Sequence, residues 1–206
     1  MLDFMLPEKH AISILKKDHH LVKDLFDKFE KADSGAEKEK IIAKAVTELK
    51  IHAAIEEEIF YPAVRKQLGA DMMNEADEEH HVAKVLIAEL DVKQGGGDHR
   101  NAKFTVLAEN VRHHIKEEEN EMLPKAKALD IDFEALGQQM LDRKEELKDT
   151  GVPKDSEHAM VAGAKGRADS PAAAARKTPP AAKKPARKTT TAASGTAKRG
   201  SARASH

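Results

Sequence analysis

Two stretches of eleven residues, HAAIEEEIFYP at positions 52–62 and HIKEEENEMLP at positions 114–124, decide the fold of this chain. Each has a histidine, a glutamate four residues later, and a proline six residues after that glutamate. Two shorter stretches also match each other, DHHLVK at 18–23 and EHHVAK at 79–84. In both cases the second copy follows the first by 61 or 62 positions. The sequence therefore predicts a duplicated helical hairpin.

Apolar residues recur at spacings of three and four along each predicted helix, which is the pattern of a helix that buries one stripe in a bundle. Glycine and proline are scarce before residue 150, and only 3% of residues are aromatic, so a β protein is not indicated. The four stripes are Ile12, Leu15, His19, Val22, Phe26, Phe29; Ile42, Ala45, Leu49, His52, Glu56, Ile59, Ala63; Met73, Ala76, His80, Ala83, Ile87, Leu90; and Phe104, Leu107, Val111, His114, Glu118. The pattern predicts an all-α fold, an antiparallel up-down-up-down four-helix bundle with a short fifth helix at about residues 133–148.

Six polar residues interrupt the apolar stripes: His19, His52, Glu56, His80, His114 and Glu118. Burying an imidazole or carboxylate without a partner costs roughly 2 to 7 kcal/mol, so the six require partners. Each lies near the middle of its helix, and residues four apart share a helix face, so all six can meet at one level. A duplicated hairpin has approximate two-fold symmetry, which suits two metal ions with two histidines each, bridged by Glu56 and Glu118. Imidazole and carboxylate donors without thiolate favour iron, ahead of manganese or zinc.

The chain lacks cysteine, which excludes disulfides, thiolate zinc sites and cysteine nucleophiles. Its net charge of −1 is the sum of two opposite parts. Residues 164–206 carry eleven Lys or Arg against one acidic residue, a charge of +10, whereas the residues before them carry −11. The basic segment has no large apolar residue. We therefore expect a metal-binding bundle at 1–155 and a disordered, basic Ala/Lys/Pro-rich tail at 156–206.

At the residues quoted above the chain resembles the hemerythrin-like family, the HHE cation-binding domains, whose hallmark is a His, an H-x3-E, another His and a second H-x3-E on successive helices. The resemblance covers about residues 10–128. It implies a non-haem di-iron centre, bridged by carboxylates and by an oxide or hydroxide, with dioxygen, peroxide, nitric oxide or iron itself as the species bound.

The chain departs from the oxygen carriers of that family at two places. They have an H-x3-H in the third helix, where this chain has Lys84 four residues after His80. Reversible oxygen carriage is therefore not expected. They also have an H-x4-D in the fourth helix, and this leaves Glu118 and Glu119 as alternative ligands.

Neighbours of the six residues are assigned other roles. Three histidines flank the stripes and are expected at the surface or beside ligands: His20, His81 and His113. Four glutamates are expected to be solvated or to accept hydrogen bonds from histidine N–H groups: Glu57, Glu58, Glu117 and Glu119. Tyr61, the only tyrosine, is expected to pack rather than to take part in redox chemistry. Pro62 and Pro124 are expected to kink helices that continue past them.

From these observations we expect a protein that binds or senses a small molecule, or iron, in the response to oxidative or nitrosative stress. One alternative is a di-iron enzyme that degrades peroxide or oxidises ferrous iron, with no catalytic residue assigned. Another is an architectural protein whose tail, similar to those of linker histones, contacts nucleic-acid phosphates without sequence preference. No segment approaches the roughly 18 apolar residues of a membrane span, and the start lacks a secretory pattern. We expect a cytoplasmic protein, nucleoid-associated if its tail binds DNA.

Overall fold

A computed structural model of the chain describes residues 6–91 and 97–168. Every regular element within these two ranges is helical, which confirms the predicted all-α fold. Within the same ranges, no helix is both long enough and apolar enough to cross a membrane. The elements are α1 (Ala11–Lys31), α2 (Gly35–Ile55), η2 (Glu56–Phe60), α3 (Tyr61–Leu68), α4 (Ala70–Asp91), α5 (Gly97–Glu117), η3 (Glu118–Met122), α6 (Leu123–Lys127), α7 (Phe133–Thr150) and α8 (Ser156–Ala168).

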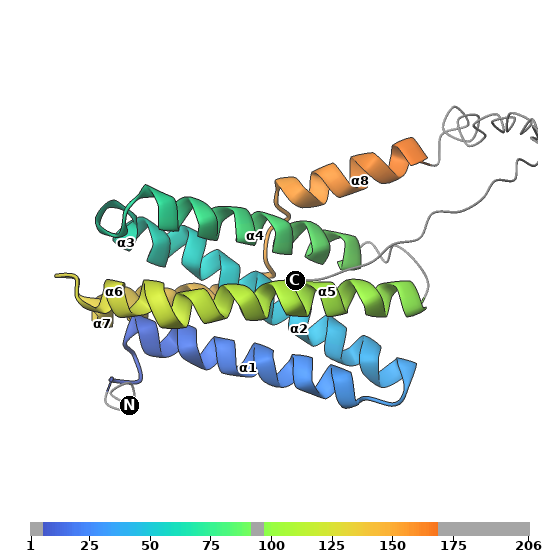
Figure 1. The fold of residues 1–206 in the computed structure, drawn as a ribbon, viewed down its shortest axis with the longest axis horizontal. Helices are drawn as coiled ribbons and strands as arrows, with labels where there is room; N and C mark the ends of the chain where they lie inside the picture. The colour runs from blue at the N-terminus through green and yellow to red at the C-terminus, as the bar shows by residue number, and fades with distance from the viewer. Residues whose placement is uncertain (1–5, 92–96, 169–206) are drawn as a thin grey trace, which may run out of the picture.

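Four long helical columns form the body of the bundle: α1, then α2 continued by η2 and α3, then α4, then α5 continued by η3 and α6 (Figure 1). Short connections, such as residues 32–34 after α1 and Gly69 after α3, turn the chain back so that successive columns are antiparallel. α1 packs on α2, and α4 packs on α5. Each half of the duplicated sequence therefore forms one hairpin, and the predicted up-down-up-down bundle is confirmed.

The second and fourth columns each contain one π-helical turn, which begins at a glutamate of the buried stripe. In η2 the Tyr61 N–H donates to the Glu56 carbonyl, and in η3 the Leu123 N–H donates to the Glu118 carbonyl. One residue separates the end of each turn from a proline. Proline has no N–H, and its ring displaces the carbonyl four residues earlier, so it disturbs a regular α-helix. The wider π turn makes room for the ring, and the helix does not end there. The helices continue past their prolines, as predicted.

The π turn also moves the buried stripe of the second column by one residue. The 3,4 spacing predicts Ile59 and Ala63 in the core, but both are only partly buried, whereas Phe60 and Val64 are fully buried. Ile59 and Ala63 still pack against the core, but they lie at its edge and not at its centre. A pattern that assumes a uniform α-helix cannot reveal one extra residue in a turn.

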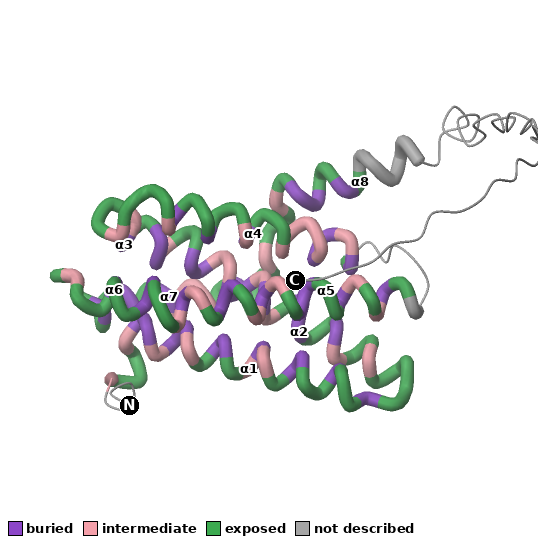
Figure 2. The backbone as a smooth tube through the Cα atoms, in the orientation of Figure 1, coloured by how far each residue is buried: buried purple, intermediate pink, exposed green. Residues whose placement is uncertain are grey.

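The buried apolar residues form two clusters, one on each side of the six polar residues. The first includes Ile12, Leu15 and Met73. The second includes Phe26 and Phe104, whose rings meet edge to face with centroids 5.7 Å apart. Figure 2 shows buried segments recurring along each of the four columns. Close packing on both sides buries the polar residues and holds their helices in place.

α7 packs along α1 and α2 and is the fifth helix expected at residues 133–148. Asp132 caps it, since its side chain accepts a hydrogen bond from the Ala135 N–H. Gly137 faces the segment that precedes α1. A Cβ atom there would come within 1.9 Å of the Lys9 carbonyl oxygen, so any other residue would push α7 away from the bundle.

Residues 156–168, which the sequence-based division placed in the tail, form α8 against α4. Its contacts are largely polar: Glu157 Oε1 lies 2.8 Å from His81 Nδ1, and His158 Nε2 lies 2.9 Å from Asp91 Oδ2. Val161 adds a buried apolar contact. The division at residue 155 did not anticipate this helix, because composition reports apolar content and not pairing with a distant helix. The remainder of the predicted tail, residues 169–206, lies outside the described residues.

Candidate metal centre

The six polar residues of the stripes converge between the two apolar clusters. They come from four columns: His19 from α1, His52 and Glu56 from the second column, His80 from α4, and His114 and Glu118 from the fourth column. None has more than 6% of its surface exposed. The rings of His19 and His52 lie 4.9 Å apart between centroids. Those of His80 and His114 lie 4.8 Å apart. The structure thus brings together every residue that the sequence predicted as a metal ligand.

Donor atoms of these residues form two groups, and the atoms of each group lie within 4.8 Å of one another. One group consists of His19, His52, Glu56 and Glu118, and the other of Glu56, His80 and His114. Glu56 Oε1 lies 3.3 Å from His52 Nε2, and Glu56 Oε2 lies 3.4 Å from His80 Nε2. Glu118 Oε2 lies 3.2 Å from His19 Nε2 and 3.7 Å from His114 Nε2. Each carboxylate therefore lies between the two histidine pairs.

Several buried polar atoms at this centre have no hydrogen-bond partner within the part of the chain that the structure describes: His19 Nε2, His52 Nε2, both carboxylate oxygens of Glu56, and Glu118 Oε2. Leaving a buried polar atom unpaired costs about 1–3 kcal/mol, and more if the group is charged. A metal ion takes the lone pairs of imidazole and carboxylate groups together. The donor set therefore fits a bound cation.

Each histidine of the centre turns its Nδ1 atom toward another carboxylate, farther from the bundle axis, and we call these four residues the outer carboxylates. The Nδ1···O distances are 3.0 Å for His19 and Glu119, 3.5 Å for His52 and Asp18, 2.9 Å for His80 and Glu57, and 2.7 Å for His114 and Glu79. An imidazole whose Nδ1–H faces a carboxylate directs its Nε2 lone pair inward. This is the orientation that a metal ligand needs.

Three outer carboxylates also pair with a lysine: Asp18 with Lys144 of α7, Glu119 with Lys23 of α1, and Glu57 with Lys84 of α4. Among the described residues, Glu79 has no lysine or arginine partner. The lysines neutralise the outer carboxylates on three sides of the centre, and the side of Glu79 stays negative.

The carboxylates raise the proton affinity of two histidines. Burial lowers the pKa of His19, but Glu118 and Glu119 outweigh burial and raise this pKa to about 9. Burial also lowers the pKa of His80, but Glu56 and Glu57 outweigh burial and raise this pKa to about 10. Both imidazoles are therefore cationic at neutral pH in the metal-free protein, and protons compete with a metal for their nitrogens.

Tyr61 is part of the centre, although the sequence analysis expected it only to pack. Its hydroxyl donates to Glu118 Oε1 at 3.0 Å and lies 3.1 Å from His80 Nε2. Burial, with the charges of Glu118 and Glu56, raises the pKa of Tyr61 well above its usual value, so the hydroxyl stays protonated. In an α-helix residue i+5 lies on the far face, but a π turn brings it above residue i, here Glu56. The aligned residue of the second half is Leu123, so Tyr61 breaks the two-fold symmetry of the centre.

The structure places the two glutamates that the sequence left as alternatives in different positions. The Glu118 side chain is 1% exposed and faces the centre, whereas the Glu119 side chain is 28% exposed and lies beside the outer nitrogen of His19. The three flanking histidines, His20, His81 and His113, are exposed and lie outside the two donor groups, as expected.

Sequence reasoning missed two of the outer carboxylates. Asp18 directly precedes His19, and Glu79 directly precedes His80, but each contacts a histidine of another helix. An available signal was the repeat itself, because DHH and EHH keep an acidic residue at the same place in both halves.

The fold and the donor groups agree with a known family. Residues 10–126 match the family described as the hemerythrin HHE cation binding domain, and the chain belongs to this family. The matched range contains the four columns up to α6 and all six residues of the centre.

A solved structure has the same fold. It is the crystal structure of a hemerythrin HHE cation binding domain-containing protein from Mycobacterium kansasii, with a TM-score of 0.55 and 24% identity, and the similarity covers 74% of this chain and 98% of that one. An uncharacterized protein of Mycobacterium tuberculosis is 27% identical over 143 residues, which are 68% of this chain and 88% of that protein. A DNA nickase of a Nostoc species is 24% identical over 107 residues, or 52% of this chain. The match spans only 30% of the length of the nickase.

Proposed function

We propose that this chain is a non-haem di-iron protein whose buried centre binds or senses a small molecule in the response to oxidative or nitrosative stress. The observation that carries the proposal is the convergence of unpartnered, buried imidazole and carboxylate atoms on one point of the bundle. In this proposal His19 and His52 hold one ion, His80 and His114 hold the other, and Glu56 and Glu118 bridge them.

The donor chemistry supports iron. Imidazole and carboxylate without thiolate suit iron best, with manganese and zinc as the competing metals. The outer carboxylates hold the four imidazoles in the orientation that binding requires. When bound, a pair of iron ions supplies redox chemistry and open coordination positions for a small ligand.

The size of the adjoining cavity supports a ligand of very few atoms. A cavity of about 30 Å³ contacts all four histidines of the centre, and much of its remaining wall is aliphatic, from residues such as Leu49, Ile87 and Val111. Because one water molecule needs about 10–15 Å³ of such space, the cavity holds roughly two heavy atoms. Dioxygen, nitric oxide and hydrogen peroxide are of this size.

Asn110 adds a polar group to this cavity. It lines the cavity, and its Oδ1 atom is buried without a hydrogen-bond partner among the described residues. A protonated ligand such as hydrogen peroxide could donate to that oxygen. The cavity thus combines small size with an acceptor for a polar ligand.

Lys84 supports sensing or reaction over reversible oxygen carriage. It stands where the oxygen carriers of the family have a fifth histidine, and its ammonium lies 3.0 Å from Glu57 Oε1. An ammonium group has no lone pair to offer a metal ion. The centre therefore has one imidazole fewer than the carriers, which leaves more of the coordination sphere to other ligands.

A second candidate function, an enzyme that degrades peroxide or oxidises ferrous iron, is favoured by Tyr61. Its protonated hydroxyl lies within 3.1 Å of His80 Nε2 and 3.5 Å of His114 Nε2. A hydroxyl at this place can turn from Glu118 and donate its hydrogen bond to a small molecule bound beside these histidines.

Metal analysis and an absorption spectrum of the protein purified in air test the leading proposal. We expect close to two iron ions per chain and the near-ultraviolet absorption of a bridged ferric pair. One ion, or none, after anaerobic iron loading would contradict the di-iron centre. Saturable spectral changes with azide or nitric oxide would support binding of small ligands, whereas sustained oxygen release from peroxide would favour the enzyme.

A further inference from the structure

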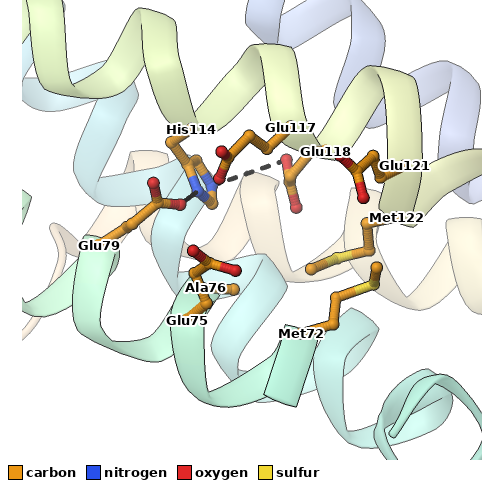
Figure 3. Close-up of a pocket in the computed structure, with 9 residues that line it drawn as sticks. All are labelled: Met72, Glu75, Ala76, Glu79, His114, Glu117, Glu118, Glu121 and Met122. Carbon is orange, nitrogen blue, oxygen red and sulfur yellow. Dashed lines mark hydrogen bonds and ion pairs between the residues drawn. The ribbon is translucent and has the colours of Figure 1, made fainter. Parts of the chain in front are cut away.

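A groove lined by carboxylates lies beside the metal centre, between α4 and the fourth column (Figure 3). It encloses a cavity of about 60 Å³. Glu75 and Glu79 line it from α4, and Glu117 and Glu121 from the fourth column. Glu75 and Glu121 are exposed, whereas Glu118, which lines the same cavity, is buried. The groove therefore leads from the surface to a carboxylate of the centre.

The negative charge of this groove is poorly balanced. No lysine or arginine is among the residues that line it. Within the described ranges, Glu75 has no hydrogen-bond or ion-pair partner. Glu121 has a distant one, because its Oε2 lies 3.8 Å from Nζ of Lys125 at the surface. Glu79 is the outer carboxylate that lacks a lysine. The groove should thus have a negative potential that attracts cations.

Two further observations point to a cation in particular. Glu118 Oε2 is buried without a hydrogen-bond partner among the described residues, and its side chain, 1% exposed, lines the inner end of the groove. Two lining residues, Glu79 and Glu117, place donor atoms within 4.8 Å of one another and of a donor atom of His113, which is exposed beside them. Glu79 connects the two ends, because its Oε1 lies 3.7 Å from His113 Nε2 and its Oε2 lies 2.7 Å from His114 Nδ1.

We propose that this groove is the access route of the metal. A hydrated divalent cation such as Fe²⁺ is attracted by the exposed carboxylates, binds transiently to Glu79, His113 and Glu117, and passes beside Glu118 into the centre. Carboxylates attract any divalent cation, whereas the imidazole-rich centre binds transition metals more strongly, so the ion moves inward. This inference rests on the proposed di-metal centre and adds the path by which its ions arrive.

The test is the rate at which the metal-free, full-length protein takes up Co²⁺ at low ionic strength, followed by the visible absorbance of the bound ion. The double variant Glu75→Gln/Glu121→Gln removes two charges from the groove and no ligand of the centre. We expect its uptake rate to fall about tenfold, with the deficit shrinking as salt is added. The number of ions bound at the end should not change. The control Glu109→Gln/Glu134→Gln has the same change of charge on exposed residues outside the groove, and should load at the unaltered rate.

Equal rates for the two double variants at low salt would overturn the access route. So would a lower final ion count in Glu75→Gln/Glu121→Gln, because these residues would then maintain the centre itself. An unaltered protein that takes up fewer than two ions contradicts the proposed di-metal centre, and the route fails with it. If both proteins bind two ions and the groove variant takes them up as fast as the unaltered protein, the di-metal centre is supported and only the access route is refuted.

Discussion

Replacing the two glutamates of the centre by glutamine should separate their roles, because they occupy different places among the donor atoms. Glu56 belongs to both donor groups, whereas Glu118 belongs only to the group of His19 and His52. Glutamine preserves the side-chain volume but offers a neutral amide in place of a charged carboxylate. We therefore expect Glu56→Gln to lose both ions and Glu118→Gln to retain about one, because Glu56, His80 and His114 remain to hold it.

Glu118→Gln should also destabilise the metal-free protein by an amount that depends on pH. The pKa of His19 is raised from 6.5 to about 9 in the folded protein, which corresponds at pH 7 to about 2.5 kcal/mol of unfolding free energy. Glu119 supplies part of this shift, so the loss of Glu118 alone should cost roughly 1–2 kcal/mol at pH 7. A raised pKa contributes its full stabilisation below pH 6.5, and the contribution is lost as pH rises through about 9. The effect of the variant should therefore be largest near pH 6 and should fade above about pH 9.

Metal analysis after anaerobic iron loading measures the first effect. Urea unfolding of chelator-treated protein at about pH 6, 7.5 and 9.5 measures the second. Glu109→Gln, exposed on α5, is the matched control and should change neither quantity. The reasoning is refuted if Glu56→Gln and Glu118→Gln retain the same number of ions, or if the destabilisation by Glu118→Gln does not vary with pH.

Three further predictions concern the tyrosine, the protons of the centre and the basic tail. Tyr61→Phe removes the hydroxyl that donates to Glu118 Oε1, so urea unfolding of the metal-free protein should show a loss of about 1–3 kcal/mol; unchanged stability would contradict this buried contact. Because the pKa values of His19 and His80 are about 9 and about 10, metal loading at pH 7 should release about two protons per chain, and metal affinity should fall as pH is lowered. An indicator dye in weak buffer measures this release, and loading without it would disprove the protonated starting state. Since residues 164–206 carry a charge of +10, the full chain should bind duplex DNA with little sequence preference and an affinity that falls about 0.9 log units per log unit of salt for each phosphate contacted. A chain that ends at residue 155 should not shift DNA in a gel, and equal binding by both chains would assign the contact to the bundle.

The sequence by itself determined the bundle and the six central residues. His19, His52, His80 and His114 could be placed on buried stripes because an α-helix repeats every 3.6 residues whatever its neighbours are. The duplication then put the stripes of the two hairpins in register. Since an unpartnered buried imidazole or carboxylate is costly, the positions of these residues already required a common partner.

Only the tertiary structure decided what surrounds the six. Tyr61 enters the centre because a π turn adds one residue between it and Glu56, and no periodic pattern reports a change of hydrogen-bond register from i+4 to i+5. Asp18 and Glu79 lie next to histidines in the chain but contact histidines of other helices. Their roles therefore depend on how the helices pack against one another. α8 is held to α4 largely by hydrogen bonds between polar side chains, which leave no apolar stripe in the sequence. Periodicity describes one helix at a time, whereas these contacts arise only when separate helices are packed together.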